Sequence, residues 1–234
     1  MTDGHQVLVS ASILNADFSR LDRVVHKMER AGADRLHLDV MDGNFVDNIT
    51  FGPDVVAAFR RLTDMPLDVH LMIAEPARYM ERFIEAGPQT ITFHVEADEG
   101  VARKTEAIAA IHAAGREAGL AVCPDTPVSA VDPWLDELDI IMIMSVYPGW
   151  GGQGFIPETA PKIAEARARL AAAGRGGLVH VDGGVNSKTA DVVGAQGIDV
   201  CVVGSALFTR GRDASAEVDL VKARALDAFA AGVR

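Results

Sequence analysis

The sequence contains few cysteines. Only Cys123 and Cys201 occur among its 234 residues. Their spacing matches no zinc-finger pattern, and we interpret both as reduced thiols of a cytoplasmic protein. Residues 1–9 lack a basic stretch followed by a long apolar stretch, so we expect no signal peptide.

Positive charge and long apolar runs are also scarce. The chain has 22 Lys and Arg against 33 Asp and Glu, a formal net charge of −11. Nucleic acids and anionic membranes bind basic surfaces, so we expect neither as a partner. No apolar run approaches the ~20 residues that span a membrane. A small anion is not excluded, because backbone N–H groups in glycine-rich loops can bind phosphate inside an acidic protein.

What the chain does have is a regular alternation of short β-rich runs and longer amphipathic stretches. Such alternation is typical of βαβ units and a parallel sheet. Asp17 and Ser187 are suitable helix N-caps, and alanine–glycine pairs end several helical patterns. We predict strands at 7–14, 35–41, 67–72, 90–96, 120–123, 140–146, 177–182 and 200–204. We predict helices at 17–31, 53–63, 76–86, 100–114, 128–136, 158–173, 187–195 and 214–231.

Eight such units without a linker favour an α/β protein folded as one (β/α)8 TIM barrel over residues 1–234. The competing fold is a doubly wound open sheet. That fold would show fewer units and a Gly-x-Gly-x-x-Gly turn after the first strand. The first strand here runs instead into Ser12-Ile13-Leu14-Asn15, which contains no glycine.

Two histidines and two aspartates lie at the ends of predicted strands. His37 and Asp39 share one face of the second strand because side chains alternate, and His70 and Asp182 end the third and seventh strands. Burying such groups unpaired is costly. Their nitrogen and oxygen donors suit Zn²⁺, Mn²⁺ or Fe²⁺. We therefore predict one divalent metal site, with His94 as a supporting group.

Glycines follow the sixth, seventh and eighth predicted strands. Gly183-Gly184 and Gly204-Ser205 lie in the loops that form the usual phosphate site of such barrels. Near the same strand ends stand Met41, Met72 and Met144. The methionines fit either core packing or a dry wall around a reacting carbon, and the sequence does not separate these interpretations.

Motifs along nearly the whole chain resemble those of the ribulose-phosphate 3-epimerase family. They include Leu36-His37-Leu38-Asp39-Val40-Met41-Asp42-Gly43, Asp68-Val69-His70-Leu71-Met72, Phe93-His94-Val95-Glu96-Ala97, Pro148-Gly149-Trp150-Gly151-Gly152-Gln153 and Val181-Asp182-Gly183-Gly184-Val185.

The resemblance implies a metal-dependent isomerase of the pentose phosphate pathway. Its reaction interconverts D-ribulose 5-phosphate and D-xylulose 5-phosphate through a metal-stabilised cis-enediolate. It also implies residue roles: Asp39 and Asp182 as the acid/base pair, and His37, Asp39, His70 and Asp182 as ligands of one Zn, Fe, Mn or Co ion. The implied substrate and phosphate positions are Ser12, His70, Gly149, Trp150, Gly151, Gly152, Asp182, Gly183, Gly184, Gly204 and Ser205.

This chemistry requires two carboxylates. Inverting a hydroxyl-bearing carbon beside a ketone needs a base on one face, an acid on the other, and a Lewis acid to stabilise the charge between them. Asp39 and Asp182 come from different sides of the predicted ring. We expect them to exchange roles with the direction of reaction.

Three residues depart from the family pattern and bear on the substrate. Tyr147 replaces the usual Asn or Glu, Trp150 replaces Phe, and Cys123 stands where Asn or Lys is common. Epimerisation of a related ketose phosphate, such as a hexulose 6-phosphate, therefore stays open, as does a non-catalytic phosphosugar-binding barrel. A Schiff-base enzyme is disfavoured because no lysine lies at a predicted strand end. We expect a homo-oligomer, as is common in the family.

Overall fold

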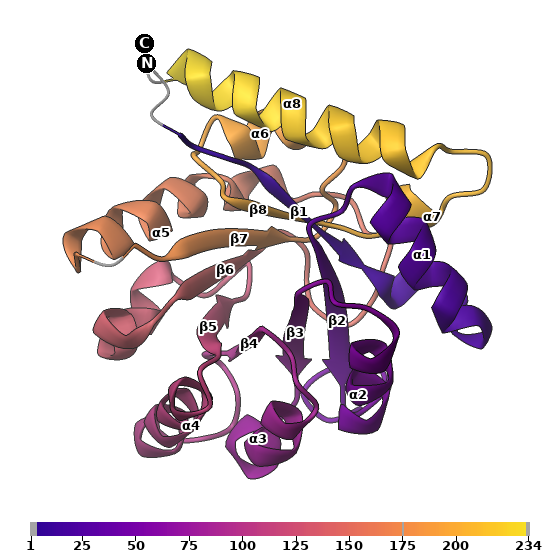
Figure 1. Cartoon of the computed structure of the whole chain (residues 1–234). Helices are drawn as coiled ribbons and strands as arrows, with labels where there is room; N and C mark the ends of the chain where they lie inside the picture. The colour runs from indigo at the N-terminus through magenta and orange to yellow at the C-terminus, as the bar shows by residue number, and fades with distance from the viewer. Residues whose placement is uncertain (1–3, 175, 233–234) are drawn as a thin grey trace.

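A computed structural model describes residues 4–174 and 176–232, which form a closed barrel of eight parallel strands in chain order. Helices surround the strands (Figure 1). The predicted (β/α)8 fold is therefore confirmed. The strands are β1 Leu8–Ser12, β2 Arg35–Met41, β3 Leu67–Met72, β4 Thr90–His94, β5 Glu117–Val122, β6 Ile140–Met144, β7 Leu178–Asp182 and β8 Val200–Val203.

Most helices follow the strands as expected, with differences at their ends, but the short helix Ser205–Phe208 was not predicted. They are α1 Leu21–Ala31, α2 Pro53–Leu62, α3 Pro76–Glu85, α4 Val101–Ala113, α5 Pro161–Ala172, α6 Ala190–Gly194, α7 Ser205–Phe208 and α8 Ala214–Gly232. Between β5 and β6 the chain forms a 3₁₀ helix, Val128–Glu137, which contains Pro133. Proline lacks an N–H and clashes with the preceding turn, which disfavours a regular α-helix there.

Of the two predicted N-cap residues, Asp17 is confirmed and Ser187 is not. Asp17 is an N-cap, accepting a hydrogen bond from the Ser19 N–H, and the helical turn that it caps is the 3₁₀ segment Phe18–Arg20. The prediction for Ser187 is wrong, because α6 begins at Ala190. The Ser187 N–H and hydroxyl instead donate to the Glu217 carboxylate, 2.8 and 3.0 Å away. This contact ties the loop after β7 to α8.

The main apolar core lies between the strands and the helices. Outward-facing residues such as Leu36, Leu38 and Val40 of β2 are buried in it. Because side chains alternate along a strand, the intervening residues His37, Asp39 and Met41 face into the barrel. The apolar outer face thus secures the sheet, while the inner face of β2 carries the polar residues His37 and Asp39.

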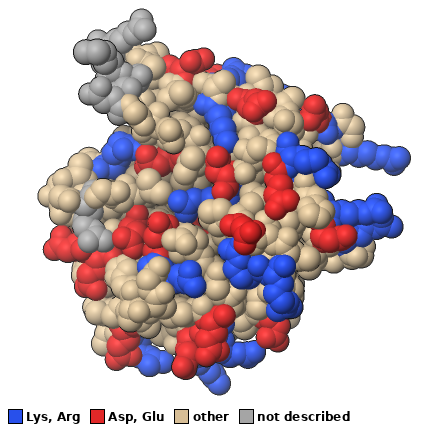
Figure 2. Space-filling view, in the orientation of Figure 1, with Lys and Arg blue, Asp and Glu red and all other residues tan. Residues whose placement is uncertain are grey.

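The surface carries mixed charges. On the face shown in Figure 2, Lys and Arg side chains are interspersed with Asp and Glu, without a continuous basic area. Among the described residues no helix has the length and apolar character needed to cross a membrane.

Candidate metal and substrate site

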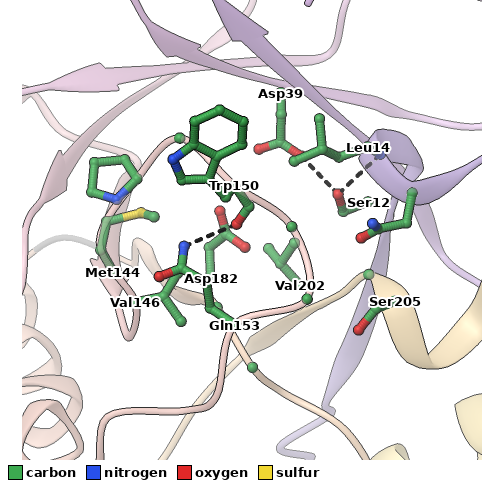
Figure 3. A pocket seen from close by; sticks show the side chains of 18 of the residues that line it. Ser12, Leu14, Asp39, Met144, Val146, Trp150, Gln153, Asp182, Val202 and Ser205 are labelled. Atoms are coloured by element: carbon green, nitrogen blue, oxygen red, sulfur yellow. Dashed lines mark hydrogen bonds between the residues drawn. The ribbon is translucent and has the colours of Figure 1, made fainter. Parts of the chain in front are cut away.

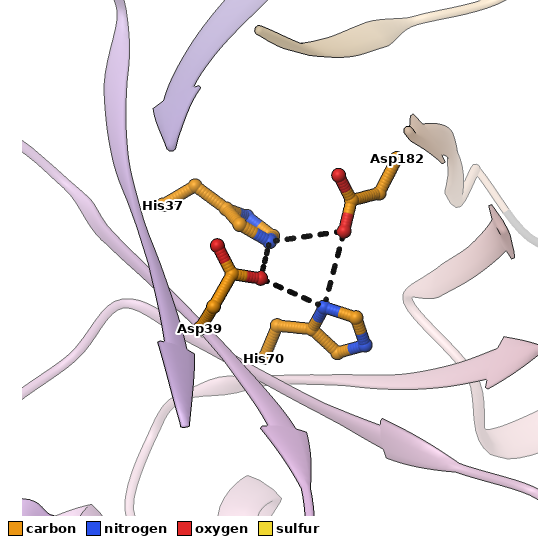
Figure 4. Close-up of side chains that lie close together, drawn as sticks. All are labelled: His37, Asp39, His70 and Asp182. Carbon is orange, nitrogen blue, oxygen red and sulfur yellow. Dashed lines mark ion pairs between the residues drawn. The ribbon is translucent and has the colours of Figure 1, made fainter. Parts of the chain in front are cut away.

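The register of β2 against β3 brings the predicted ligands together. Asp39 pairs with His70, and His37 pairs with Asp68. Asp182 reaches the same place from the end of β7. We call His37, Asp39, His70 and Asp182 the His–Asp cluster; their side chains point toward one another in Figure 4.

Four donor atoms of the cluster lie at closely similar separations. Nε2 of His37 is 3.3 Å from Oδ1 of Asp39 and 3.7 Å from Oδ2 of Asp182. Nδ1 of His70 is 3.4 Å from the same Asp39 oxygen and 3.3 Å from the same Asp182 oxygen. Ligands about 2.0–2.2 Å from a tetrahedral ion stand about 3.3–3.6 Å apart, so the spacing fits a single such cation.

The two histidine nitrogens that face the cluster support this fit. Nε2 of His37 and Nδ1 of His70 are buried and have no hydrogen-bond partner among the described residues. Leaving two buried nitrogens unsatisfied is costly, and a cation that accepts both lone pairs removes the cost. The residues present therefore suit a divalent metal ion.

The electrostatics of the cluster also favour a cation. Burial acts to lower the pKa of the His37 imidazole, but the negative charges of Asp39 and Asp68 raise it well above its ordinary value. Burial acts in the opposite sense on Asp39, yet the neighbouring His37 holds the pKa of that carboxyl well below its usual range. The carboxylates thus favour a positive charge at this position, which a metal ion can supply in place of a proton.

Asp68 orients His37 from behind, a role that was not predicted from the sequence. Its Oδ2 lies 2.9 Å from Nδ1 of His37, and it also accepts hydrogen bonds from Ser10 Oγ at 2.9 Å and Thr90 Oγ1 at 2.7 Å. A carboxylate behind a metal-binding histidine fixes the tautomer and the ring orientation. The available signal was spacing: Asp68 precedes His70 by two residues on a strand, so both face the interior.

His70 is supported differently. Its Nε2 lies 2.9 Å from Nε2 of His94, and Nδ1 of His94 lies 3.1 Å from Oε2 of Glu96. Burial lowers the pKa of His94. Glu96 belongs to the motif Phe93-His94-Val95-Glu96-Ala97, but the sequence predicted no role for it. His180 lies deeper in the barrel and is fully buried; neither of its ring nitrogens has a hydrogen-bond partner among the described residues, and Nδ1 lies 3.7 Å from Oδ2 of Asp68.

A cavity that is partly open to solvent adjoins Asp39 and Asp182 of the cluster (Figure 3). Asp39 and Asp182 both line it, so each carboxylate faces the cluster and the cavity together. Ser12 contributes its hydroxyl, which donates to Oδ2 of Asp39 at 2.7 Å. The remaining predicted residues in the lining are Met41, Met72, Met144, Gly149, Trp150, Gly151, Gly152, Gly183, Gly184, Gly204 and Ser205.

Among the predicted substrate residues, His70 and Trp150 differ sharply in their exposure. His70 is fully buried and is not among the residues lining this cavity. Trp150 lines it while remaining 59% exposed, on a loop held by Gln153. The Gln153 amide donates to the backbone oxygens of Tyr147 and Trp150 at 2.7 and 2.9 Å.

The loops after β6 and β7 pack closely because of glycine. A Cβ on Gly184 would lie 2.3 Å from the backbone nitrogen of Phe155, and one on Gly183 would lie 2.5 Å from Val146 Cγ2. Both glycines also have positive φ, 121° for Gly183 and 66° for Gly184. Only glycine allows this approach, which shapes one wall of the cavity.

The residues that depart from the family pattern lie around the site. The Tyr147 hydroxyl donates to Oδ2 of Asp125 at 2.9 Å, which joins the loops after β5 and β6. Cys123 is a free cysteine with Sγ 3.5 Å from Nδ1 of His94, and burial raises its pKa to about 12.

Solved structures share the fold at low sequence identity. A 3-hexulose-6-phosphate synthase from Salmonella typhimurium covers 95% of this chain and 100% of its own, with a TM-score of 0.68 and 16% identity. A protein titled KGPDC from Streptococcus mutans covers 96% and 100%, with a TM-score of 0.72 and 13% identity. These similarities concern the barrel alone.

Sequence comparisons are more specific. The family model described as the ribulose-phosphate 3 epimerase family matches residues 8–208. The ribulose-phosphate 3-epimerase of Bacillus subtilis is 44% identical over 203 residues, 86% of this chain and 92% of that protein. The enzyme of the same name from Escherichia coli is 44% identical over 204 residues, 87% and 89% of the two chains. The chain therefore belongs to the ribulose-phosphate 3-epimerase family and is an isomerase.

Proposed function

We propose that the chain interconverts D-ribulose 5-phosphate and D-xylulose 5-phosphate, using one divalent metal ion held by the His–Asp cluster. Family membership supports the reaction, and relatives such as the Bacillus subtilis protein carry its name. The observation that carries the mechanism is that Asp39 and Asp182 belong to the cluster and also line the cavity. Two carboxylates are thus available beside a bound sugar.

In this proposal Asp39 and Asp182 act on opposite faces of the reacting carbon. One removes the proton while the other returns a proton to the far side, and the roles exchange when the reaction reverses. The Ser12 hydroxyl holds one oxygen of Asp39 in place through its 2.7 Å hydrogen bond. A divalent cation bound at this position supplies Lewis-acid stabilisation for the negative charge developing on the substrate oxygens.

The cavity walls supply binding and protection. Met41, Met72 and Met144 are nearly fully buried and line the cavity, so they can keep water from the reacting carbon. We assign the substrate phosphate to the loops containing Gly183-Gly184 and Gly204-Ser205. No Lys or Arg lines the described cavity, so neutral donors, namely backbone N–H groups and side chains such as the Ser205 hydroxyl, are the ones available to the phosphate.

The test compares substrates and metal states. Protein stripped with a chelator and then reconstituted separately with Zn²⁺, Mn²⁺, Co²⁺ or Fe²⁺ is assayed on D-ribulose 5-phosphate and a hexulose 6-phosphate. We expect epimerisation that depends on metal and a higher kcat/KM for the pentulose. A higher kcat/KM for the hexulose would assign the alternative substrate. Binding without turnover in every metal form would indicate a phosphosugar-binding barrel.

Two further proposals concern the state of the protein in the cell. Like other family members, the chain is proposed to form a homo-oligomer, which analytical ultracentrifugation tests by its molecular mass. A cytoplasmic location is proposed because both cysteines are free thiols. Fluorescent tagging of the full-length protein tests the location.

A further inference from the structure

A hydrogen-bonded chain of three side chains leads away from the His–Asp cluster. It runs from Nε2 of His70 to Nε2 of His94 over 2.9 Å, then from Nδ1 of His94 to Oε2 of Glu96 over 3.1 Å. Both imidazoles are fully buried, so the contact between them is shielded from water. Glu96 is held at its other oxygen, where the Cys123 N–H donates over 2.7 Å.

Only one arrangement of protons satisfies this chain when a cation takes the lone pair on Nδ1 of His70. Neutral His70 then carries its proton on Nε2, which must donate. Nε2 of His94 must accept, since two N–H groups cannot face each other at 2.9 Å. Neutral His94 therefore has its proton on Nδ1, where the Glu96 carboxylate accepts it.

We propose that His94 and Glu96 are positioning residues that fix the tautomer of His70 and aim its Nδ1 at the metal ion. The inference rests on the proposed function, because it takes the cation to lie at the His–Asp cluster. His37 receives the same support directly from Asp68 at 2.9 Å. His70 receives this support through the neutral ring of His94. The hydrogen bond from His94 to the Glu96 carboxylate polarises the His94 ring and so strengthens the hydrogen bond that it accepts from His70.

His94, Glu96 and Cys123 also lie close enough together to suggest a second cation site. Coordination through Nδ1 of His94 would move its proton to Nε2, opposite the N–H of His70. The positively charged Lys162 is near as well, with Nζ 3.0 Å from the Cys123 carbonyl oxygen. The geometry therefore favours a hydrogen-bonded support over a second ion, and the experiment separates the two.

The first measurement reads the tautomers in the unmodified protein. Protein with ¹⁵N-labelled histidine, loaded with one equivalent of Zn²⁺, is studied by NMR, because protonated and bare imidazole nitrogens have different chemical shifts. We expect His94 to carry its proton on Nδ1 and His70 on Nε2. A proton on Nε2 of His94 would overturn the proposal.

The second measurement is Zn²⁺ affinity, determined by competition with a chelator in the absence of substrate. His94→Phe keeps an aromatic ring beside Phe45, whose ring centroid lies 4.8 Å from that of His94. It removes the nitrogen that accepts the hydrogen bond from His70. We expect it to weaken Zn²⁺ binding about 10–100-fold. Glu96→Gln should weaken binding about tenfold, with no further loss when added to His94→Phe, because it acts through the same ring.

Cys123→Ala is the matched control. It removes the thiol beside His94 and keeps the backbone N–H that holds Glu96. Unchanged affinity at one Zn²⁺ per chain would support the proposal. Loss of a second Zn²⁺ in this variant, or additive losses of affinity in the double variant, would overturn it.

If His94→Phe does not fold, the Zn²⁺ affinity of Glu96→Gln and the NMR measurement test the proposal. If the protein does not epimerise the substrate but the His94 and Glu96 variants lose Zn²⁺ affinity as expected, only the proposed function is refuted. If turnover depends on metal but these variants bind Zn²⁺ as tightly as the unmodified protein, the positioning role is refuted.

Discussion

Nδ1 of His37 lies 2.9 Å from Oδ2 of Asp68, and both side chains are fully buried inside the barrel. This contact leaves Nε2 of His37 facing Asp39 and Asp182. The orientation of one proposed metal ligand thus depends on a residue that does not itself face the metal position. The contribution of the contact between Asp68 and His37 to metal affinity can be measured.

Replacing Asp68 with Asn should weaken metal binding about 10–100-fold, because the amide no longer offers a charged acceptor to His37. Chelator competition measures the change. Asp199→Asn is the control, since Asp199 is also a buried carboxylate but bonds the Val179 N–H at 2.8 Å and Arg167 at 2.6 Å. It should lower stability and leave metal affinity unchanged. Equal losses of affinity in the two variants would contradict the role assigned to Asp68.

Metal-induced stabilisation should increase with pH. In the metal-free protein burial acts to lower the His37 pKa, but Asp39 and Asp68 raise it well above the ordinary value. The protonated ring therefore stabilises the metal-free fold fully below about pH 6.5, and this contribution is lost as pH rises through the folded pKa.

A cation requires the unprotonated nitrogen, so protons compete with it over the same range. We expect the increase in Tm caused by Zn²⁺ to be small at about pH 5.5 and large at about pH 8. Differential scanning fluorimetry with and without metal measures it. A Tm increase that is constant or falls with pH would show that Zn²⁺ does not displace a proton from this site.

Gly184→Ala should disturb the cavity wall. The new Cβ would stand 2.3 Å from the Phe155 nitrogen, at a φ of 66°. We expect a loss of about 1–3 kcal/mol in the free energy of unfolding and a higher KM. Gly154→Ala, in the adjoining loop, has nothing within 4 Å of its Cβ and should be nearly neutral. Urea unfolding and steady-state kinetics test both, and a neutral Gly184→Ala would refute the packing argument.

Asp182→Asn should lower kcat by about 10²–10⁴-fold, because an amide cannot take up or return the proton. The fold should persist, since the Asp182 side chain is 15% exposed and lies at a strand end. Circular dichroism checks the fold, and a coupled assay measures turnover. Near wild-type turnover would exclude Asp182 from proton transfer.

The sequence predicted the fold best where strand patterning was uninterrupted. The predicted bounds of 35–41 and 67–72 match β2 and β3. The start of β5 was missed because Gly119 weakens the strand pattern. A Cβ there would lie 2.5 Å from Oγ1 of Thr92, so the barrel interior requires glycine at that point.

The candidate site was predictable to the extent that it sits at strand ends. The four residues of the His–Asp cluster were predicted from their positions near strand ends, and the structure brings them together. Asp68 and Glu96 were not identified because their role depends on contacts between neighbouring strands. Register and ring orientation, which decide those contacts, do not follow from alternation within one strand.

Solvent exchange at the reacting carbon tests the central claim most directly. D-ribulose 5-phosphate is incubated in D₂O with the metal-reconstituted protein, and NMR follows the proton at carbon 3 of substrate and product. The two-aspartate mechanism predicts deuterium at that carbon in the D-xylulose 5-phosphate formed, with exchange abolished by chelation and strongly reduced in Asp182→Asn. Product formed without deuterium, or exchange that persists unchanged without metal, would contradict it.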